Sequence, residues 1–477
     1  MMIGSLLVTV LLAGSPLKLN GDNISQIVNE LTTEEKAALL VGSGAKAFDG
    51  VGYTTLYVKG SAGTTHPIER LGIPAIVLAD GPAGVRIDDR PCTKFPIGTS
   101  LASTWNPSLV EEVGGAIGNE VLEYGVDVLL APGINIQRNP LCGRNFEYYS
   151  EDPLLAGRVA AGYIRGIQSQ GVGTSIKHFA ANNQELNRLY LDARVPVRAL
   201  REIYLRNFEI AIKESDPWTV MTSYNYVNGT LAAENHDLAT GVLRDDWGYK
   251  GVVMTDWAAG LYSDKMVASG NDMIQPGSDE HYNRLVNSMT DGSLPMPVVD
   301  TAVARLLRLI VKCPRFKGYE YSNKPNLRHN ASVARKAAEE GIVLLKNDAA
   351  SLPLAPESKI ALFGVTSYEF ITGVLHGHSA VPEVRVTQAE AERIGGADLL
   401  GGVVPVAAVD AFTVVDVVDV LDVVPFRDSG WSRTVERVVD RFVGEDLRHG
   451  SGRRVIVIAY RNAHRKPSAR SFLTGKH

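Results

Sequence analysis

Cysteine is scarce in this sequence, which has three, Cys92, Cys142 and Cys313, among 477 residues. An odd and low count excludes a scaffold held together by disulfides, and the lack of any Cys-x-x-Cys pair makes a structural zinc site unexpected. Cys92 and Cys142 both lie near expected strand ends, so they could pair in an exported protein. Two buried thiols are the interpretation that we prefer.

An excess of positive charge is also missing. The formal net charge is −5 and the isoelectric point is about 6.1. A surface that attracts phosphate groups needs a basic field, so we expect neither a nucleic acid nor an anionic membrane as a partner. The oligomeric state is left open by these observations.

Long apolar stretches are absent as well, and no segment is long enough to cross a bilayer. Residues 1–20 contain a short apolar core like that of a secretory signal. No Lys or Arg precedes this core, however, and Pro16 disfavours cleavage after Ser15. The localisation therefore stays open: periplasmic or secreted if the segment is a signal peptide, and cytoplasmic otherwise.

Apolar residues in general are plentiful, at 45% of the chain, and this length predicts two domains or a large barrel with an addition. The most informative stretch is Gly-Val-Val-Met-Thr-Asp-Trp at 251–257. Its apolar run predicts a buried parallel strand that ends in an acid and an indole. A purely structural alternative is that Asp256 caps a helix beginning at Ala258.

Other expected strands also end in polar side chains, and these are Asp80, Lys177, His178 and Tyr224. The strands are 73–79, 126–131, 173–176, 218–223 and 271–274, and the helices between them are 107–124, 153–170 and 196–214. Repetition of strand, polar tip and helix predicts an α/β fold made of (β/α) units that form a parallel, TIM-like barrel. The carboxyl ends of barrel strands meet at one face, where active sites form.

We expect the catalytic barrel to occupy residues 21–314. Residues 21–40 predict helices, with Thr32 and Glu35 at the spacing of a capping box. Residues 42–66 are rich in Gly, Thr and Ser and predict a long loop.

The chain after the barrel predicts a change of domain. Residues 315–330 have the composition of a linker, and 331–373 predict the start of a second α/β unit. Within it we expect a helix at 331–341 and strands at 342–347 and 359–364.

Residues 374–477 form an atypical tail. Lysine nearly disappears there, with Lys466 and Lys476 remaining, and 414–424 repeat valine and aspartate with a period of three. That period fits neither a strand nor a helix. We hypothesise that the tail is out of frame or otherwise foreign, the alternative being a divergent α/β domain.

The side chains at the strand tips combine carboxylates, cations and aromatic rings, without a cluster typical of a metal site. Such a set suits a sugar, because charged groups bind vicinal hydroxyls and an indole stacks on a pyranose face. Asp256 is the candidate nucleophile of glycoside hydrolysis. We expect Lys177 and Arg144 to lower its pKa, and Asp80 to bind hydroxyls.

Each of these residues also has a structural interpretation. Asp80 precedes Gly81-Pro82 and could form an Asx turn. Lys177 and His178 are neighbours, so strand alternation should turn one of them outward unless the strand twists at its tip. Tyr224 could belong to the core, and Arg144 could lie at the surface.

Several long motifs occur in one order along the chain. They are Leu-Ala-Asp-Gly-Pro-Ala-Gly-Val-Arg at 78–86, Phe-Pro-Ile-Gly-Thr at 95–99, Gly-Arg-Asn-Phe-Glu-Tyr-Tyr-Ser-Glu-Asp-Pro at 143–153, Lys-His-Phe-Ala at 177–180, Met-Thr-Ser-Tyr-Asn at 221–225 and Met-Thr-Asp-Trp at 254–257. With these motifs, residues 21–372 resemble the β-glucosidases of glycoside hydrolase family 3.

The resemblance implies a (β/α)8 barrel followed by an α/β sandwich, and a retaining, cofactor-free hydrolase that acts on β-glucosides or short oligosaccharides. It gives Asp256 the role of nucleophile and Trp257 that of the stacking indole. The residues that it implies for binding the terminal sugar are Asp80, Arg86, Arg144, Lys177, His178, Met221 and Tyr224.

The sequence departs from the family where the second domain should continue. The family's general acid/base is a Glu on a loop of that domain, and the match stops at about Gly373, so we assign no glutamate to this role. The sandwich is therefore expected to be incomplete and the activity impaired. A carbohydrate-binding pseudoenzyme and a β-xylosidase are the alternatives, and the linkage specificity stays open.

Overall fold

The computed structural model describes residues 17–44, 46–48, 51–348, 352–354, 360–362, 414–416 and 456–458. Within the described residues, the chain divides between Ile342 and Val343 into two compact units, which are described separately. Residues 1–16 lie outside the described residues, so the structure does not test the interpretation of residues 1–20 as a signal.

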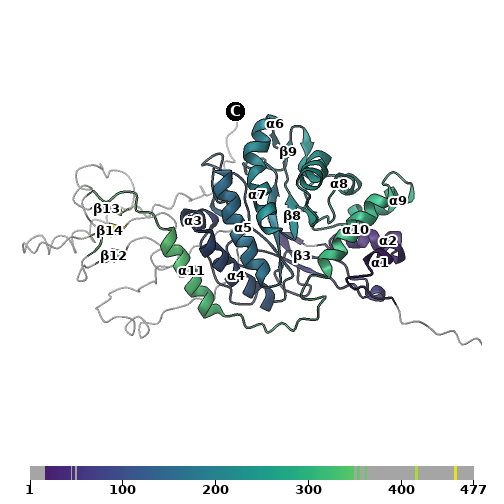
Figure 1. Cartoon of the computed structure of the whole chain (residues 1–477), viewed down its shortest axis with the longest axis horizontal. Helices are drawn as coiled ribbons and strands as arrows, with labels where there is room; N and C mark the ends of the chain where they lie inside the picture. The colour runs from purple at the N-terminus through teal and green to yellow at the C-terminus, as the bar shows by residue number, and fades with distance from the viewer. Residues whose placement is uncertain are drawn as a thin grey trace, which may run out of the picture. The chain divides into compact units, whose positions relative to one another are not determined.

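A mainly parallel sheet forms the centre of the first unit (Figure 1). Its strands, in spatial order, are β11 (Val252–Thr255), β8 (Thr219–Thr222), β6 (Gly173–Phe179), β5 (Val128–Leu130), β4 (Val77–Asp80) and β3 (Gly63–Thr64). All neighbours pair in parallel except β3, which is antiparallel to β4. The predicted α/β class is confirmed, and the apolar runs of the sequence form the central strands of the sheet.

Backbone hydrogen bonds continue beyond β11 toward β3. Met254 bridges Met273 in parallel, Ile274 N donates to Leu40 O at 2.8 Å, and Gly42 N donates to Ile274 O at 2.8 Å. Ser43 N then donates to Thr64 O of β3 at 2.9 Å. The two edges of the sheet are thus linked through short extended segments, one of which lies within the strand predicted at 271–274.

The prediction of a long loop at 42–66 was wrong. The segment contains β3 and a small hairpin of β1 (Lys46–Phe48) and β2 (Val51–Tyr53). These strands are two or three residues long and have no apolar alternation. Pairing with β4, the next strand of the sheet along the chain, stabilises β3, so the composition of 42–66 did not reveal it.

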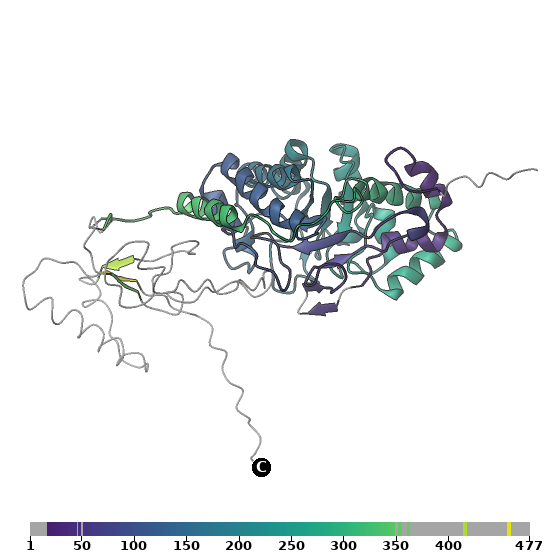
Figure 2. The same cartoon turned by 90° about the horizontal axis from the view of Figure 1, so that it is seen from below.

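Helices pack around the sheet in two groups (Figures 1 and 2). One group consists of α3 (Gly98–Ser103), α4 (Pro107–Glu123), α5 (Pro153–Ser169), α7 (Arg206–Ser215) and α11 (Leu327–Gly341). The other consists of α1 (Ile24–Glu30), α2 (Thr33–Leu40), α8 (Ser263–Ser269), α9 (Asp279–Thr290) and α10 (Met296–Ile310). The shorter elements are η1 (Glu69–Leu71), η2 (Asn145–Glu147), β7 (Asp192–Ala193), β9 (Tyr226–Val227), β10 (Thr230–Leu231), η4 (Ala232–Glu234) and the π-helix η5 (Asp237–Asp246).

The helix starts follow from their capping residues. Thr32 and Glu35 form the predicted capping box at α2. Asp152 caps α5, whose first residue is Pro153, as the preference for proline at that position predicts. The helix predicted at 196–214 is interrupted, because α6 (Val197–Ala199) leads into a π-helix, η3 (Leu200–Tyr204), before α7 begins.

Successive residues of β4 and β8 belong to different cores. Val77 and Ala79 of β4 belong to one cluster of buried apolar side chains, whereas Leu78 belongs to a second. In β8, Val220 and Met221 divide in the same way. The two-residue period of a strand therefore places Asp80 on the same side as Leu78, at the carboxyl end of β4.

The part of the chain from Val343 onward is described in short pieces. β12 (Ile360–Leu362) pairs in parallel with β14 (Ile456–Ile458), and β13 (Val414–Asp416) pairs antiparallel with β14. β12 lies within the strand predicted at 359–364, and β13 lies within the repetitive segment of the tail. The origin of the tail and the domain limits stay predictions.

The prediction of a strand at 342–347 was wrong. These residues form no regular element, and Leu345 is 91% exposed. An apolar run resembles a buried strand in local sequence, but a strand also needs a partner for its backbone groups.

The three cysteines are free thiols, with Cys92 and Cys313 buried and Cys142 half-buried. Within the described residues, no helix is long and apolar enough to span a membrane.

Candidate active site

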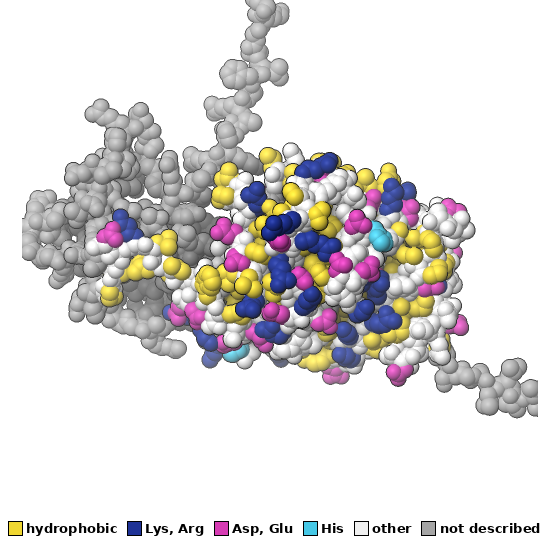
Figure 3. All heavy atoms as spheres, turned by 45° about the horizontal axis from the view of Figure 1, so that its top comes forward, with side chains coloured by type: hydrophobic (Ala, Val, Ile, Leu, Met, Phe, Trp, Pro, Cys, Tyr) yellow, Lys and Arg dark blue, Asp and Glu magenta, His cyan; other side chains and the backbone are white. Residues whose placement is uncertain are grey.

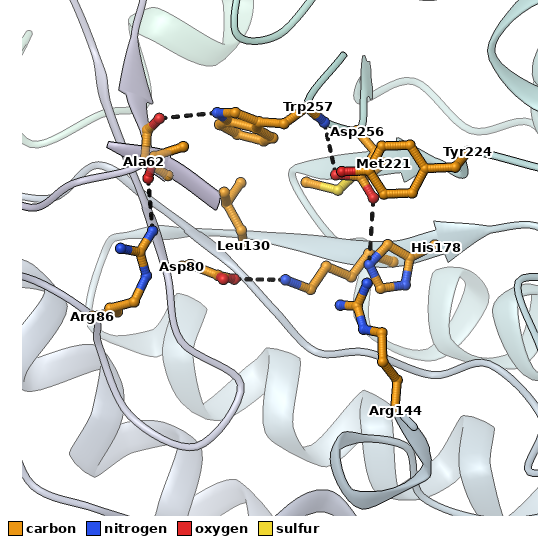
Figure 4. A pocket seen from close by; sticks show the side chains of 12 residues that line it. Ala62, Asp80, Arg86, Leu130, Arg144, His178, Met221, Tyr224, Asp256 and Trp257 are labelled. Carbon is orange, nitrogen blue, oxygen red and sulfur yellow. Dashed lines mark hydrogen bonds and ion pairs between the residues drawn. The ribbon is translucent and has the colours of Figure 1, made fainter. Parts of the chain in front are cut away.

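The nine site residues expected from the sequence line one pocket at the carboxyl ends of the parallel strands (Figure 4). They are Asp80, Arg86, Arg144, Lys177, His178, Met221, Tyr224, Asp256 and Trp257. Gly52, Ala62 and Leu130 complete the lining.

Asp256 lies directly after β11 and is 7% exposed. Its Oδ1 accepts a hydrogen bond from the Trp257 amide at 2.7 Å, and its Oδ2 lies 3.6 Å from His178 Nε2. Helix α8 begins only at Ser263, so Asp256 is not a helix cap. Its position instead follows from β11, whose buried strand delivers the carboxylate into the pocket.

Burial raises the pKa of Asp256 above its usual 3.8, while the charges of Arg144 and Lys177 lower it. The sequence predicted the direction of the two cationic effects. The expectation that the pKa is lowered overall was wrong, because the removal of the carboxylate from water raises the pKa by more than the two cations lower it. A bound sugar would add hydroxyl donors to this carboxylate, and such donors favour its ionised form.

This raised pKa predicts a pH-dependent change in stability for Asp256→Asn. A carboxyl group whose pKa is higher in the folded state favours folding when protonated and opposes it when ionised. At pH 7 the Asn variant should therefore have the larger free energy of unfolding, and near pH 3 the difference should vanish. Urea denaturation at both pH values measures it. A variant that is less stable than the parent at pH 7 contradicts the electrostatic interpretation.

Asp80 and Lys177 form a buried ion pair in the pocket. Lys177 Nζ lies 2.6 Å from Asp80 Oδ1, and their side chains are 4% and 8% exposed. The pair joins the ends of β4 and β6. Asp80 is thus oriented by a cation, as a residue that binds hydroxyls requires, and an Asx turn alone does not describe its role.

Arg144 and Arg86 bring two further cations to the pocket. Arg144 forms a buried ion pair with Glu147, and its Nη2 has no hydrogen-bond partner among the described residues. Arg86 Nη2 donates to Gly52 O at 2.8 Å. Sequence analysis did not single out Glu147, although it lies in the same quoted motif as Arg144.

Lys177 and His178 both line the pocket although they are neighbours in one strand. The register between β6 and β8 shifts between Ile176 and Phe179. Such an irregularity interrupts the alternation of side chains, so both residues can face the same side. Local sequence identified the conflict, and the irregular pairing resolves it.

The indole of Trp257 is fixed against the segment that was predicted to be a loop. Its Nε1 donates to Ala62 O at 3.0 Å (Figure 4). A Cβ atom at Gly52 would collide with this indole, and at Gly63 it would lie 3.4 Å from it. Gly52 must therefore lack a side chain. The need for glycine at position 52 comes from its contact with the Trp257 indole, which composition alone did not show.

Paired charges are common on the surface of the first unit. Acidic and basic side chains are interspersed over the face in Figure 3, and pairs such as Arg165–Glu111, at 2.8 Å, join neighbouring helices. Among the described residues, no group of three or more His, Cys, Asp or Glu side chains is arranged to hold a metal ion.

Comparison with known proteins identifies the family of this chain. Residues 58–309 match the model of the glycosyl hydrolase family 3 N terminal domain. That match spans more than half of the chain, which therefore belongs to glycosyl hydrolase family 3.

Two curated relatives show how much of a family member the chain represents. It is 42% identical over 358 residues to an exo-alpha-(1->6)-L-arabinopyranosidase of Bifidobacterium longum, covering 71% of this chain and 45% of the relative. It is 40% identical over 356 residues to thermostable beta-glucosidase B of Acetivibrio thermocellus, covering 72% and 44%. The chain thus spans about half the length of these relatives.

A solved structure shares the fold. Beta-glucosidase 3B from Thermotoga neapolitana, in complex with glucose, matches with a TM-score of 0.73 and 48% sequence identity, covering 78% of this chain and 54% of that one.

Proposed function

We propose that this chain carries the sugar-binding and nucleophilic half of a retaining, exo-acting β-glycosidase, most specifically a β-glucosidase. The observation that supports this most is the buried Asp256 carboxylate in a pocket that also holds the Asp80–Lys177 pair and the Trp257 indole. The names of the relatives and the glucose complex of the similar structure support a sugar as the ligand.

The proposed reaction uses Asp256 as nucleophile. A carboxylate oxygen attacks the anomeric carbon, the bond to the leaving oxygen breaks, and a covalent glycosyl ester forms. Water then attacks the same carbon and loses a proton, which balances the proton taken up by the leaving oxygen, and the ester bond breaks to regenerate the carboxylate. Two inversions give a product with the configuration of the substrate.

The charged residues of the pocket suit the binding of one terminal sugar. Asp80 accepts hydrogen bonds from hydroxyls, while Lys177 and Arg144 donate them, each as a charge-assisted contact. Trp257 offers an apolar face to the ring. Such bonds raise the rate when they strengthen toward the oxocarbenium-like transition state.

We further propose that the first unit is a (β/α)8 barrel in which β3 runs opposite to the other strands. The hydrogen bonds that link β11 to β3 through Ile274 and Gly42 support this. The segment from 331 is proposed to begin an α/β sandwich.

A substrate panel tests the proposed function. Dinitrophenyl β-glucoside should give the largest kcat/KM, ahead of the β-xyloside and of the α-L-arabinopyranoside suggested by one relative's name. Binding of glucose without turnover of any activated glycoside would instead identify a carbohydrate-binding pseudoenzyme. A preference for the xyloside would favour the β-xylosidase alternative.

Asp80→Ala and Lys177→Ala should each lower kcat/KM for dinitrophenyl glucoside by about 10²-fold, because each removes a charged hydrogen bond and leaves its buried partner unpaired. The double variant should lose less than the product of the two single losses, since the two groups form one pair. Initial rates of all four proteins give this coupling. Unchanged kcat/KM in both single variants would contradict the sugar-pocket proposal.

A further inference from the structure

The orientation of the Asn135 amide is fixed by the backbone of His178. Asn135 lies in the segment after β5 and is 1% exposed. Its Nδ2 donates to His178 O at 2.9 Å, and its Oδ1 accepts from His178 N at 2.8 Å. In a flipped amide, the NH2 group would face the His178 N–H, and the oxygen would face His178 O. The carbonyl oxygen must therefore be the atom that faces the His178 N–H.

The same oxygen determines which ring nitrogen of His178 carries a proton. Asn135 Oδ1 lies 3.2 Å from His178 Nδ1. An amide oxygen only accepts, so a hydrogen bond between these atoms requires a proton on Nδ1. The hydroxyl of Tyr148 also lies 3.2 Å from Nδ1, and it has an acceptor for its own proton in Asn182 O at 3.5 Å.

The other ring nitrogen faces the nucleophile. His178 Nε2 lies 3.6 Å from Asp256 Oδ2, and the Tyr224 hydroxyl also contacts this carboxylate. A neutral ring with its proton on Nε2 would donate to Oδ2 after a small movement. Such a bond would withdraw charge from the nucleophile and occupy the place of a substrate hydroxyl.

We propose that Asn135 is a positioning residue that holds neutral His178 in the Nδ1–H tautomer. Nε2 then accepts a hydrogen bond from a sugar hydroxyl and does not donate one to Asp256. The consequence for catalysis rests on the proposed function, whereas the tautomer itself does not.

The tautomer is measured directly by NMR of the ¹⁵N-histidine-labelled protein, with His178→Gln used to identify the His178 ring signals. The parent protein should show a protonated Nδ1 and an unprotonated Nε2 at a pH where the ring is neutral. A protonated Nε2 in the parent overturns the proposal, whatever the activity.

Two variants of Asn135 separate positioning from packing. Asn135→Ala removes the acceptor, so Tyr148 can donate to Nδ1 and the proton should move to Nε2. Asn135→Asp keeps an acceptor oxygen beside Nδ1 and should keep the proton there, but its second oxygen opposes His178 O and its charge adds to that of Asp256, so this variant reports the ring protonation and not the rate. Asn207→Ala is the matched control, because Asn207 is equally buried and donates to Ile134 O, one residue before Asn135.

The functional readout is the rate at which dinitrophenyl 2-deoxy-2-fluoro-β-glucoside labels Asp256, a step that needs little acid assistance. Asn135→Ala should slow labelling about tenfold to a hundredfold, the usual effect of one hydrogen bond to a charged group. Asn207→Ala should lower stability without changing the tautomer and without slowing the labelling to the same extent. Equal slowing by Asn135→Ala and Asn207→Ala, with unchanged His178 signals, overturns the proposal. Failure to label the parent at all counts against the proposed function instead.

Discussion

Replacement of Asp256 by Asn is expected to lower kcat/KM for dinitrophenyl β-glucoside by about 10⁴-fold or more, the size of loss seen when a nucleophile is removed. The amide is nearly isosteric with the carboxylate, so the Trp257 amide bond and the pocket should persist. What disappears is the anionic oxygen that attacks the anomeric carbon.

Two controls make this result specific. Asp245→Asn makes the same chemical change at an exposed position and should leave kcat/KM unchanged. In the parent, the fluoro-glucoside should modify Asp256, and peptide mass spectrometry locates the label. The parent's kcat/KM should also fall with decreasing pH through a pKa above 3.8, because burial raises that of Asp256. A label on another residue would refute the assignment of Asp256.

The second large effect concerns the leaving group. No glutamate of this chain is assigned as general acid, and general acid catalysis usually contributes about 10²–10⁴-fold. Dinitrophenolate leaves without a proton, so its glucoside should form the glycosyl-enzyme. Alkyl glucosides and cellobiose need protonation of the leaving oxygen and should react slower by about that factor.

The fate of the intermediate gives an independent measurement. Without a base to activate water, the glycosyl-enzyme should accumulate, and turnover should show a burst followed by a slow phase. Azide needs no base, so it should accelerate the slow phase and yield β-glucosyl azide, the retained anomer. Full hydrolysis of cellobiose with a bell-shaped pH profile would show that the chain contains its own acid/base.

The sequence by itself determined the elements with strong local signals. The apolar run of β11 and the Asp256-Trp257 pair at its end were both visible in seven consecutive residues. The capping box of Thr32 and Glu35 and the proline at the start of α5 located helix starts for the same reason. These features depend on neighbours along the chain, which a sequence displays directly.

Some of the residues that line the pocket could be predicted from the sequence. Residues at strand tips could be named because parallel strands bring their carboxyl ends to one edge. Their partners were not predicted. Asn135 beside His178 and Ala62 beside the Trp257 indole come from segments with no distinctive signal, whereas Glu147 lies in the same motif as Arg144 and was not singled out.

Only the tertiary structure decided three further features, because each depends on contacts between different segments of the chain. The antiparallel β3 depends on pairing with β4, and the shared direction of Lys177 and His178 depends on irregular pairing with β8. The pKa of Asp256 depends on burial and two cations together, and sequence gave the cations but not the burial. Local pattern thus fixed which side chains reach the pocket, whereas contacts between strands fixed their geometry and charge state.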